Sequence, residues 1–122
     1  MLRSFLNNRY RSFGYAFNGF RFLWKEDHFK LHLLALVLVI SMAVYFQISS
    51  IEWLFVVLAS ALVLISEAVN TAIEKTLDFI KMEQDKKIGA IKDMSAAFVL
   101  LSAFSAVIVG AIIFIPKIES LF

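Results

Sequence analysis

Three long apolar segments dominate the hydropathy pattern of the chain and predict three membrane-spanning helices, at residues 29–48, 51–80 and 94–115. The first and third segments have about the 20 residues that a helix needs to cross the hydrocarbon core of a bilayer. The second is longer, at roughly 45 Å of helix, so its last turns should stand in the interface or in water. A very short turn, at residues 47–50, is expected between the first two helices.

Residues 1–28 follow a different pattern, in which large apolar side chains, mostly aromatic, recur every three or four positions. This pattern predicts an amphipathic helix on the membrane surface, because aromatic residues suit the interface and arginines suit anionic lipid. The alternative is a core-facing helix of a soluble bundle. A signal peptide is not expected, since the basic region is too long. The stripe consists of Leu6, Tyr10, Phe13, Phe17, Phe20 and Trp24.

The third apolar segment carries small residues at four-residue spacing, namely Ser102, Ala106 and Gly110. Such spacing is typical of a face for close helix packing, without chemistry of its own. Pro116 and Lys117 are expected to end this helix.

The composition favours an all-α integral membrane protein. Hydrophobic residues make up 61% of the chain, compared with about 45–50% in soluble domains. A length of 122 residues predicts a single domain, 1–122. Because there is no cysteine, a disulfide framework, a thiolate zinc site and a cysteine nucleophile are excluded.

Basic residues are distributed unevenly along the chain. Of the twelve Lys and Arg residues, six lie within residues 1–30 and four within 81–92, whereas the opposite side has only Lys117. By the positive-inside rule, residues 1–30 and residues 81–92 should both face the cytoplasm. The end of the second span that carries Glu74 and Asp78 should then face the cytoplasm as well.

A polar stripe begins inside the second apolar segment. Glu67, Asn70, Glu74 and Asp78 fall within an arc of roughly 80° on a helix. A carboxylate at membrane depth costs on the order of 2.5–3.5 kcal/mol on insertion scales. We therefore expect a bound cation or a reaction to offset that cost.

Three more charged residues are expected at the same depth, namely Glu26 before the first span and Lys92 and Asp93 after the charged loop. Carboxylates in this number suit Mg²⁺, which is usually shared with substrate phosphates. A lysine suits a nucleotide phosphate. Glu67, which lies deeper, could act as general base. Metal, cation and positioned base are the parts that phosphoryl transfer needs.

Two other interpretations fit the polar stripe equally well. Polar residues on membrane helices also hold helices together, and they also line proton or ion paths. No standard nucleotide-binding or zinc-protease motif is present. His28 and His32 flank the start of the first span and are interpreted as polar anchors rather than metal ligands. Three helices can hardly enclose a site alone, so an oligomer with sites between subunits is expected.

Residues 67–78, EAVNTAIEKTLD, resemble the prokaryotic diacylglycerol kinase family, whose members are small membrane enzymes unrelated to soluble kinases. They fit the family signature E-x-x-N-[ST]-A-[IV]-E-x-x-x-D completely. The family's K-D followed by small residues appears at 92–97, and its S-F-x-Y-A-x-x-G appears at 12–19. The resemblance covers about residues 10–117.

The resemblance implies a homotrimer of three-span subunits with composite active sites between neighbours. It implies Mg²⁺-dependent transfer of a phosphoryl group from ATP to a lipid alcohol, at the cytoplasmic face of a bacterial inner membrane and without a nucleic-acid partner. By position, Glu67 matches the catalytic base, and Glu26 and Glu74 match metal-binding carboxylates. The positions that match nucleotide-contacting or supporting residues are Tyr15, Asn70, Asp78, Glu83, Asp85, Lys92 and Asp93.

The family acts on diacylglycerol or on undecaprenol, and three stretches resemble the undecaprenol branch more closely. These are residues 15–19, 32–34 and 115–117. Undecaprenol is therefore the expected substrate and diacylglycerol the alternative. A small oligomeric ion-coupled transporter that uses Glu67, or a purely structural membrane subunit, is the alternative of another class. The polar stripe favours the kinase, because it continues into the charged loop and no matching polar path leads to the other face.

Overall fold

The computed structural model of this protein describes residues 1–80 and 85–122. Within these ranges every regular element is a helix. Three of the four helices are long and apolar enough to cross a membrane, so the predicted all-α fold with three candidate spans is confirmed. The helices are α1 (Leu2–Leu23), α2 (Asp27–Tyr45), α3 (Ser50–Ile80) and α4 (Lys86–Glu119).

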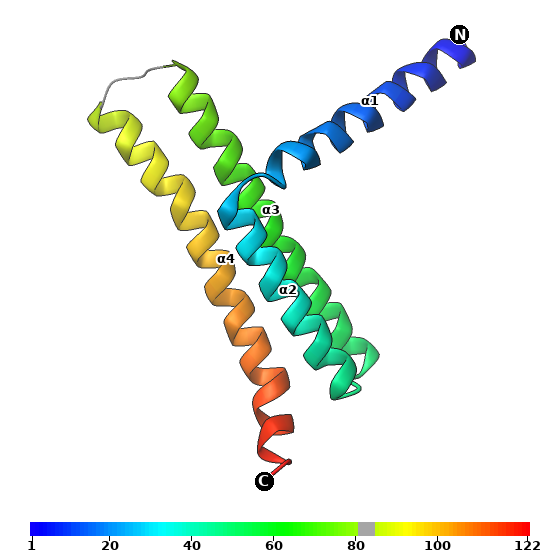
Figure 1. Ribbon diagram of the computed structural model, residues 1–122, viewed down its shortest axis with the longest axis vertical. Helices are drawn as coiled ribbons and strands as arrows, with labels where there is room; N and C mark the ends of the chain where they lie inside the picture. Colours follow the sequence, from blue (N-terminus) through cyan, green and yellow to red (C-terminus); the bar gives the residue numbers. More distant parts are fainter. Residues whose placement is uncertain (81–84) are drawn as a thin grey trace.

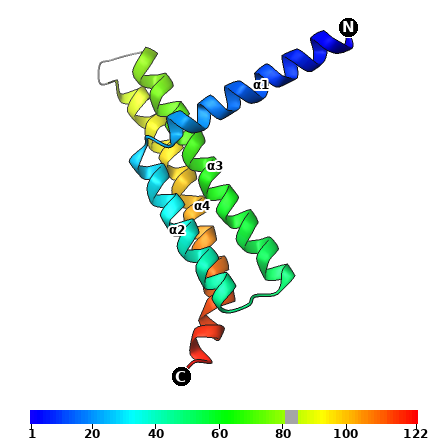
Figure 2. The ribbon, with the colours of Figure 1, turned by 45° about the vertical axis from the view of Figure 1, so that its right-hand side comes forward.

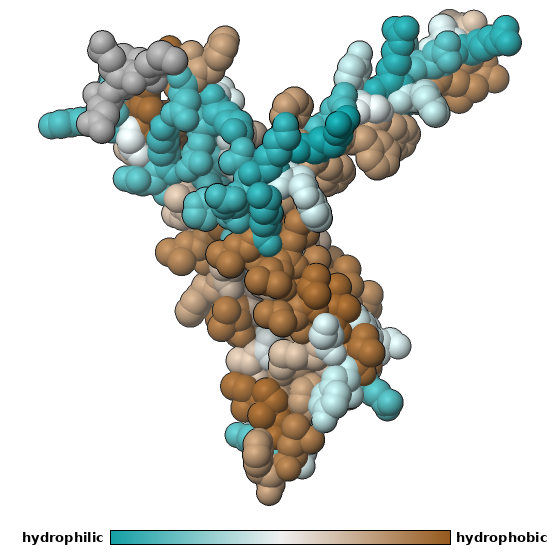
Figure 3. Space-filling view, in the orientation of Figure 1, coloured by the Kyte–Doolittle hydropathy of each residue, from teal (hydrophilic) through white to brown (hydrophobic). Residues whose placement is uncertain are grey.

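The three candidate spans run side by side, and α1 projects away from them (Figures 1 and 2). No residue of α1 is buried against the bundle. The surface of the spans is mostly apolar along their lower two-thirds, and polar residues gather around the end where α1 joins (Figure 3). Most large apolar side chains of the spans face outward, which is the arrangement that a hydrocarbon solvent permits. The position of α1 on a membrane surface stays a prediction.

The turn between α2 and α3 is fixed by a capping box. The backbone N–H of Ser49 donates to Oε2 of Glu52 at 2.8 Å, and the backbone N–H of Glu52 donates to Oγ of Ser49 at 3.2 Å. Gln47, just before it, adopts a left-handed φ of 48° that reverses the chain. The apolar core lies at this end of the bundle and consists of Ala43, Ile48, Val56, Ile113 and Phe114.

The predicted ends of the third apolar helix were wrong, because the helix extends further in both directions. Residues 86–93, which were expected in a charged loop, form the first two turns of α4, and Asp85 caps them by accepting a hydrogen bond from the backbone N–H of Lys87 at 2.8 Å. Pro116 lies inside α4 rather than ending it. The helix continues past the proline because Phe114 is buried and Lys117 forms an ion pair with Glu52 of α3, at 2.8 Å.

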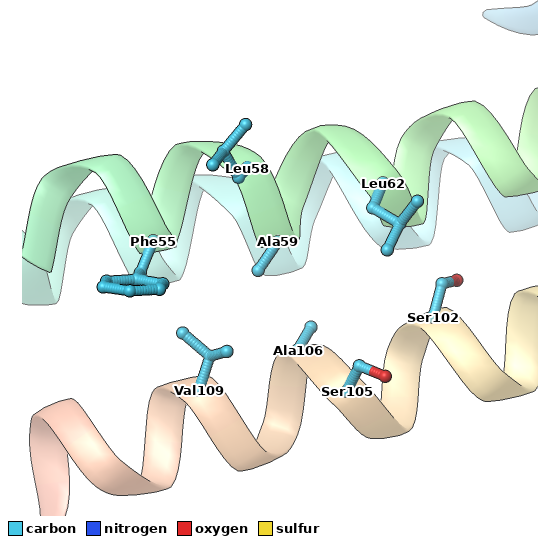
Figure 4. A pocket seen from close by; sticks show the side chains of 8 residues that line it. All are labelled: Phe55, Leu58, Ala59, Leu62, Ser102, Ser105, Ala106 and Val109. Carbon is cyan, nitrogen blue, oxygen red and sulfur yellow. The ribbon is translucent and has the colours of Figure 1, made fainter.

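The small-residue face of α4 is only partly used for close packing. Ser102 is buried against α3, and Ala106 faces Ala59 across a shallow apolar groove of about 200 Å³ (Figure 4). A side chain added at Gly110 would meet nothing within 4 Å. The helices α3 and α4 therefore pack closely around Ser102, near the polar half of the bundle. Toward Gly110 the packing of α4 is looser.

Candidate active site

A groove of about 380 Å³ opens between α2, α3 and α4 in the half of the bundle that carries the acidic stripe. Its polar wall consists of His28, His32, Glu67, Asn70 and Glu74, from α2 and α3. Its opposite wall comes from α4 and consists of Ala96, Val99, Leu100 and Ala103. A charged wall that faces an apolar wall suits a molecule with a polar head and an apolar body.

Glu67 is buried at the floor of this groove. Only 4% of the residue is exposed, since its position on α3 turns it toward the neighbouring helices. Its Oε2 atom lies 3.6 Å from Nε2 of His32 on α2. That distance is too long for a direct hydrogen bond but places two ionisable groups beside each other away from water. A buried carboxylate needs such a partner to carry its charge.

Two serines of α4 fix the polar side chains of α3. The Oγ of Ser95, which is 1% exposed, donates to Oδ1 of Asn70 at 2.6 Å. Because the carbonyl oxygen of the Asn70 amide is then engaged, its NH₂ group is the part left to donate into the groove. Deeper in the bundle, the Oγ atoms of Ser66 and Ser102 lie 2.6 Å apart. These contacts hold α4 against α3 without an apolar core.

Two ion pairs stand at the rim of the groove. The Nζ of Lys75 lies 2.8 Å from Oε1 of Glu26, which joins the residue before α2 to α3. Lys92 donates to Oδ1 of Asp78, which joins α4 to α3. Both pairs are partly or largely solvated, so each sets the position of a charge more than it stabilises the fold.

This arrangement occurs in a chain with clear relatives. A family model described as prokaryotic diacylglycerol kinase matches residues 14–114, most of the chain. The chain belongs to the prokaryotic diacylglycerol kinase family. It is therefore an enzyme of a lipid kinase family, and such kinases take their phosphoryl group from ATP. The prediction of an enzyme is confirmed, against the transporter and the structural subunit.

Relatives in this kinase family carry two different names. The chain is 32% identical over 120 residues to the undecaprenol kinase of Bacillus subtilis, and the match covers 95% of both proteins. It is 35% identical over 112 residues to the diacylglycerol kinase of Synechocystis, covering 90% of this chain and 64% of that protein. It is 33% identical over 101 residues to the diacylglycerol kinase of Escherichia coli K12, covering 82% and 83%.

The structure brings together the first part of the kinase signature. Glu67, Asn70 and Glu74 all line the groove, as the arc of the acidic stripe predicts. Asp78 lies one turn beyond them and pairs with Lys92 rather than with a groove residue. Glu26 stands at the rim through its contact with Lys75, the neighbour of Glu74.

Among the described residues that match nucleotide-contacting positions of the kinase family, Tyr15, Asp85 and Asp93 lie away from this groove. Tyr15 is 72% exposed on α1. Asp93 is exposed on α4, and Asp85 caps the start of that helix. Glu83 lies outside the described residues.

The described carboxylates of this kinase do not form a metal-binding cluster. No group of three or more His, Asp or Glu side chains within residues 1–80 and 85–122 is arranged to hold a metal ion. Glu74 lines the groove, and Glu26 is held by Lys75 at its rim. One or two carboxylates are nevertheless the usual protein share of a Mg²⁺ ion that also binds phosphates.

Sequence reasoning missed three contacts of this kinase. They are the approach of His32 to Glu67, the ion pair of Lys75 with Glu26, and the hydrogen bond from Ser95 to Asn70. A signal existed for the first, because His28 and His32 are four residues apart and so share one helix face. The spacing does not reveal which neighbour that face meets.

Proposed function

We propose that this protein phosphorylates the hydroxyl group of undecaprenol with ATP and Mg²⁺, at the cytoplasmic face of a bacterial inner membrane. The observation that carries the proposal is the position of Glu67, a buried carboxylate at the floor of a groove whose other wall is apolar. A lipid alcohol has the matching shape, with one polar group at the end of a long apolar chain. The match to undecaprenol kinase over 95% of both chains supports the choice of lipid.

In the proposed function, Glu67 acts as the general base. In the proposed step its carboxylate takes the proton of the lipid hydroxyl while the hydroxyl oxygen bonds to the γ-phosphorus of ATP. The bond from that phosphorus to the bridging oxygen breaks, and ADP leaves with the electron pair. The Asn70 NH₂ group, oriented by Ser95, points a donor at the same region and stabilises negative charge there.

Glu26 and Glu74 are the residues that would hold Mg²⁺. They come from two different elements, and the Glu26–Lys75 contact keeps Glu26 beside the turn of α3 that carries Glu74. When bound, the ion would offset the charge of the phosphate oxygens. Lys75 must release Glu26 for this to happen, and its ammonium group is then available to a phosphate. Lys92 can likewise leave its ion pair with Asp78 and bind a phosphate instead.

A homotrimer with sites between subunits completes the proposal. Tyr15 is largely exposed, and α1 projects away from its own bundle (Figure 1). In a trimer, α1 of one subunit can lie over the groove of its neighbour and bring Tyr15 to a nucleotide there. The single-subunit groove would then be the lipid-side half of the active site.

The test is phosphate transfer from labelled ATP in mixed micelles, with undecaprenol and diacylglycerol offered separately. We expect transfer mainly to undecaprenol, and its loss in Glu67→Gln. Glu119→Gln is the matched control, because Glu119 is exposed at the far end of α4 and should keep full activity. Transfer mainly to diacylglycerol would retain the mechanism and overturn the lipid. No transfer to either lipid from folded protein would overturn the proposed function.

A further inference from the structure

The buried base has a proton-accepting neighbour that the reaction described above does not use. His32 lies 3.6 Å from Glu67, and 21% of its side chain is exposed, compared with 5% for the side chain of Glu67. The histidine is therefore the more solvent-accessible member of this pair. It also lines a second, mostly apolar pocket along α2 and α3.

The titratable groups around this pair are few. His28 lies one turn from His32 on the same helix, and Glu74 lies two turns from Glu67 on α3. The wall from α4 presents no titratable side chain to the groove. The two lysines at the rim are paired with Glu26 and Asp78. Among the described residues, His32 is thus the ionisable group that lies beside Glu67, and a neutral imidazole can accept a proton.

We propose that His32 positions the Glu67 carboxylate and receives the proton that Glu67 takes from the lipid hydroxyl. This inference rests on the proposed function. The hydroxyl proton passes first to a Glu67 oxygen as the oxygen–phosphorus bond forms. It then passes from the carboxylic acid to the lone pair of His32 Nε2, which regenerates the carboxylate and leaves an imidazolium. The imidazolium releases the proton to water at the open side of the groove.

The burial of Glu67 favours such a step in repeated turnover. A carboxylic acid that is 4% exposed has little contact with water to which it could lose its proton. A lysine beside Glu67 would remain charged and could not accept the proton, whereas a neutral imidazole can accept it and then release it. The alternative is that His32 merely anchors α2 by packing and polarity, in which case its loss affects stability rather than proton transfer.

The test compares pH–rate profiles of full-length wild type, His32→Gln and Ser41→Ala in mixed micelles, with the alcohol that the wild type phosphorylates. We expect His32→Gln to lower kcat by about 10- to 100-fold, with KM values for ATP and lipid within about threefold of wild type. The acidic limb of the kcat profile should move in His32→Gln and stay in place in Ser41→Ala, since the Ser41 hydroxyl is exposed and bonds to the backbone of its own helix. An unmoved limb with near-normal kcat in His32→Gln would overturn the inference.

Chemical rescue separates proton transfer from packing. Imidazole added to His32→Ala should raise kcat about tenfold or more, and it should not raise the activity of Glu67→Gln. The ¹⁵N resonances of the His32 ring should also shift in Glu67→Gln, while those of His28 should not. Failure of rescue together with unshifted His32 resonances would overturn this inference and leave the proposed function standing. A wild type that phosphorylates neither alcohol would overturn the proposed function, and this inference with it.

Discussion

The ammonium group of Lys75 and the carboxylate of Glu26 are 2.8 Å apart, so Lys75 forms an ion pair with a carboxylate that is proposed to bind Mg²⁺. The lysine and the metal compete for the same oxygen atoms. Both side chains are substantially solvated, and the pair is therefore weak enough to be displaced.

Replacing Lys75 with methionine should consequently strengthen the response to Mg²⁺. We expect the Mg²⁺ concentration for half-maximal transfer, at saturating ATP, to fall roughly two- to fivefold, because no cation competes for Glu26. Arg3→Met at the start of α1 removes the same charge outside the groove and should leave this concentration unchanged. A higher Mg²⁺ requirement in Lys75→Met would show that the lysine helps to assemble the site instead.

Ser95→Ala should destabilise the fold and lower activity together. The mutation removes the hydrogen bond to Asn70 at a position that is 1% exposed, at a cost of about 1–3 kcal/mol. It also frees the Asn70 amide to rotate. SDS-induced unfolding and initial rates measure the two effects. Ser105→Ala is the control, since the Ser105 hydroxyl is exposed and bonds only within its own helix. Equal effects of the two mutations would contradict the prediction.

The contact between Ser66 and Ser102 should behave as a coupled pair. In a double-mutant cycle of Ser66→Ala and Ser102→Ala, we expect a coupling free energy of unfolding of about 0.6–1.7 kcal/mol, which lies between the average and the maximum for hydrogen bonds between membrane helices. The cycle is measured by SDS titration of the four proteins. Additive single effects would mean that the 2.6 Å contact contributes nothing to stability.

Lys117→Met should lower the melting temperature without changing the reaction. The Lys117–Glu52 pair joins the end of α4 to the start of α3, at the end of the bundle away from the groove. We expect a decrease of roughly 2–6 °C and an unchanged kcat at a temperature where both proteins are folded. The charge-reversed double variant, Glu52→Lys with Lys117→Glu, should recover part of the lost melting temperature. A change in kcat would mean that the two ends of the bundle are coupled.

The number and type of the helices could be predicted from the sequence, and the ends of α4 could not. About 20 apolar residues in a row specify a membrane span with little ambiguity. Residues 86–93 are charged and include a glycine, so local composition favoured a loop. The capping hydrogen bond at Asp85 and the ion pair at Lys117, which extend the helix, are contacts that composition does not encode.

The residues of the candidate site that lie on one helix could be predicted from the sequence, whereas the contacts between helices could not. The arc that contains Glu67, Asn70 and Glu74 follows from the geometry of a single helix, and the structure places all three in one groove. The rotation of α2 about its own axis determines whether His32 meets Glu67, and packing against α3 sets that rotation. The same limit applies to Ser95, whose partner lies on another helix.

The core residues Ala43, Ile48, Val56, Ile113 and Phe114 all gather at the end of the bundle away from the groove. Around the groove, hydrogen bonds between small polar side chains add to the burial of Phe29, next to His28, and of Val63, one turn from Glu67. The chain is thus held together by apolar packing at one end and by polar contacts between α3 and α4 at the other. In the proposed function, a lipid alcohol enters the groove sideways from the surrounding membrane at the polar end, while the apolar core keeps the helices in register at the other end.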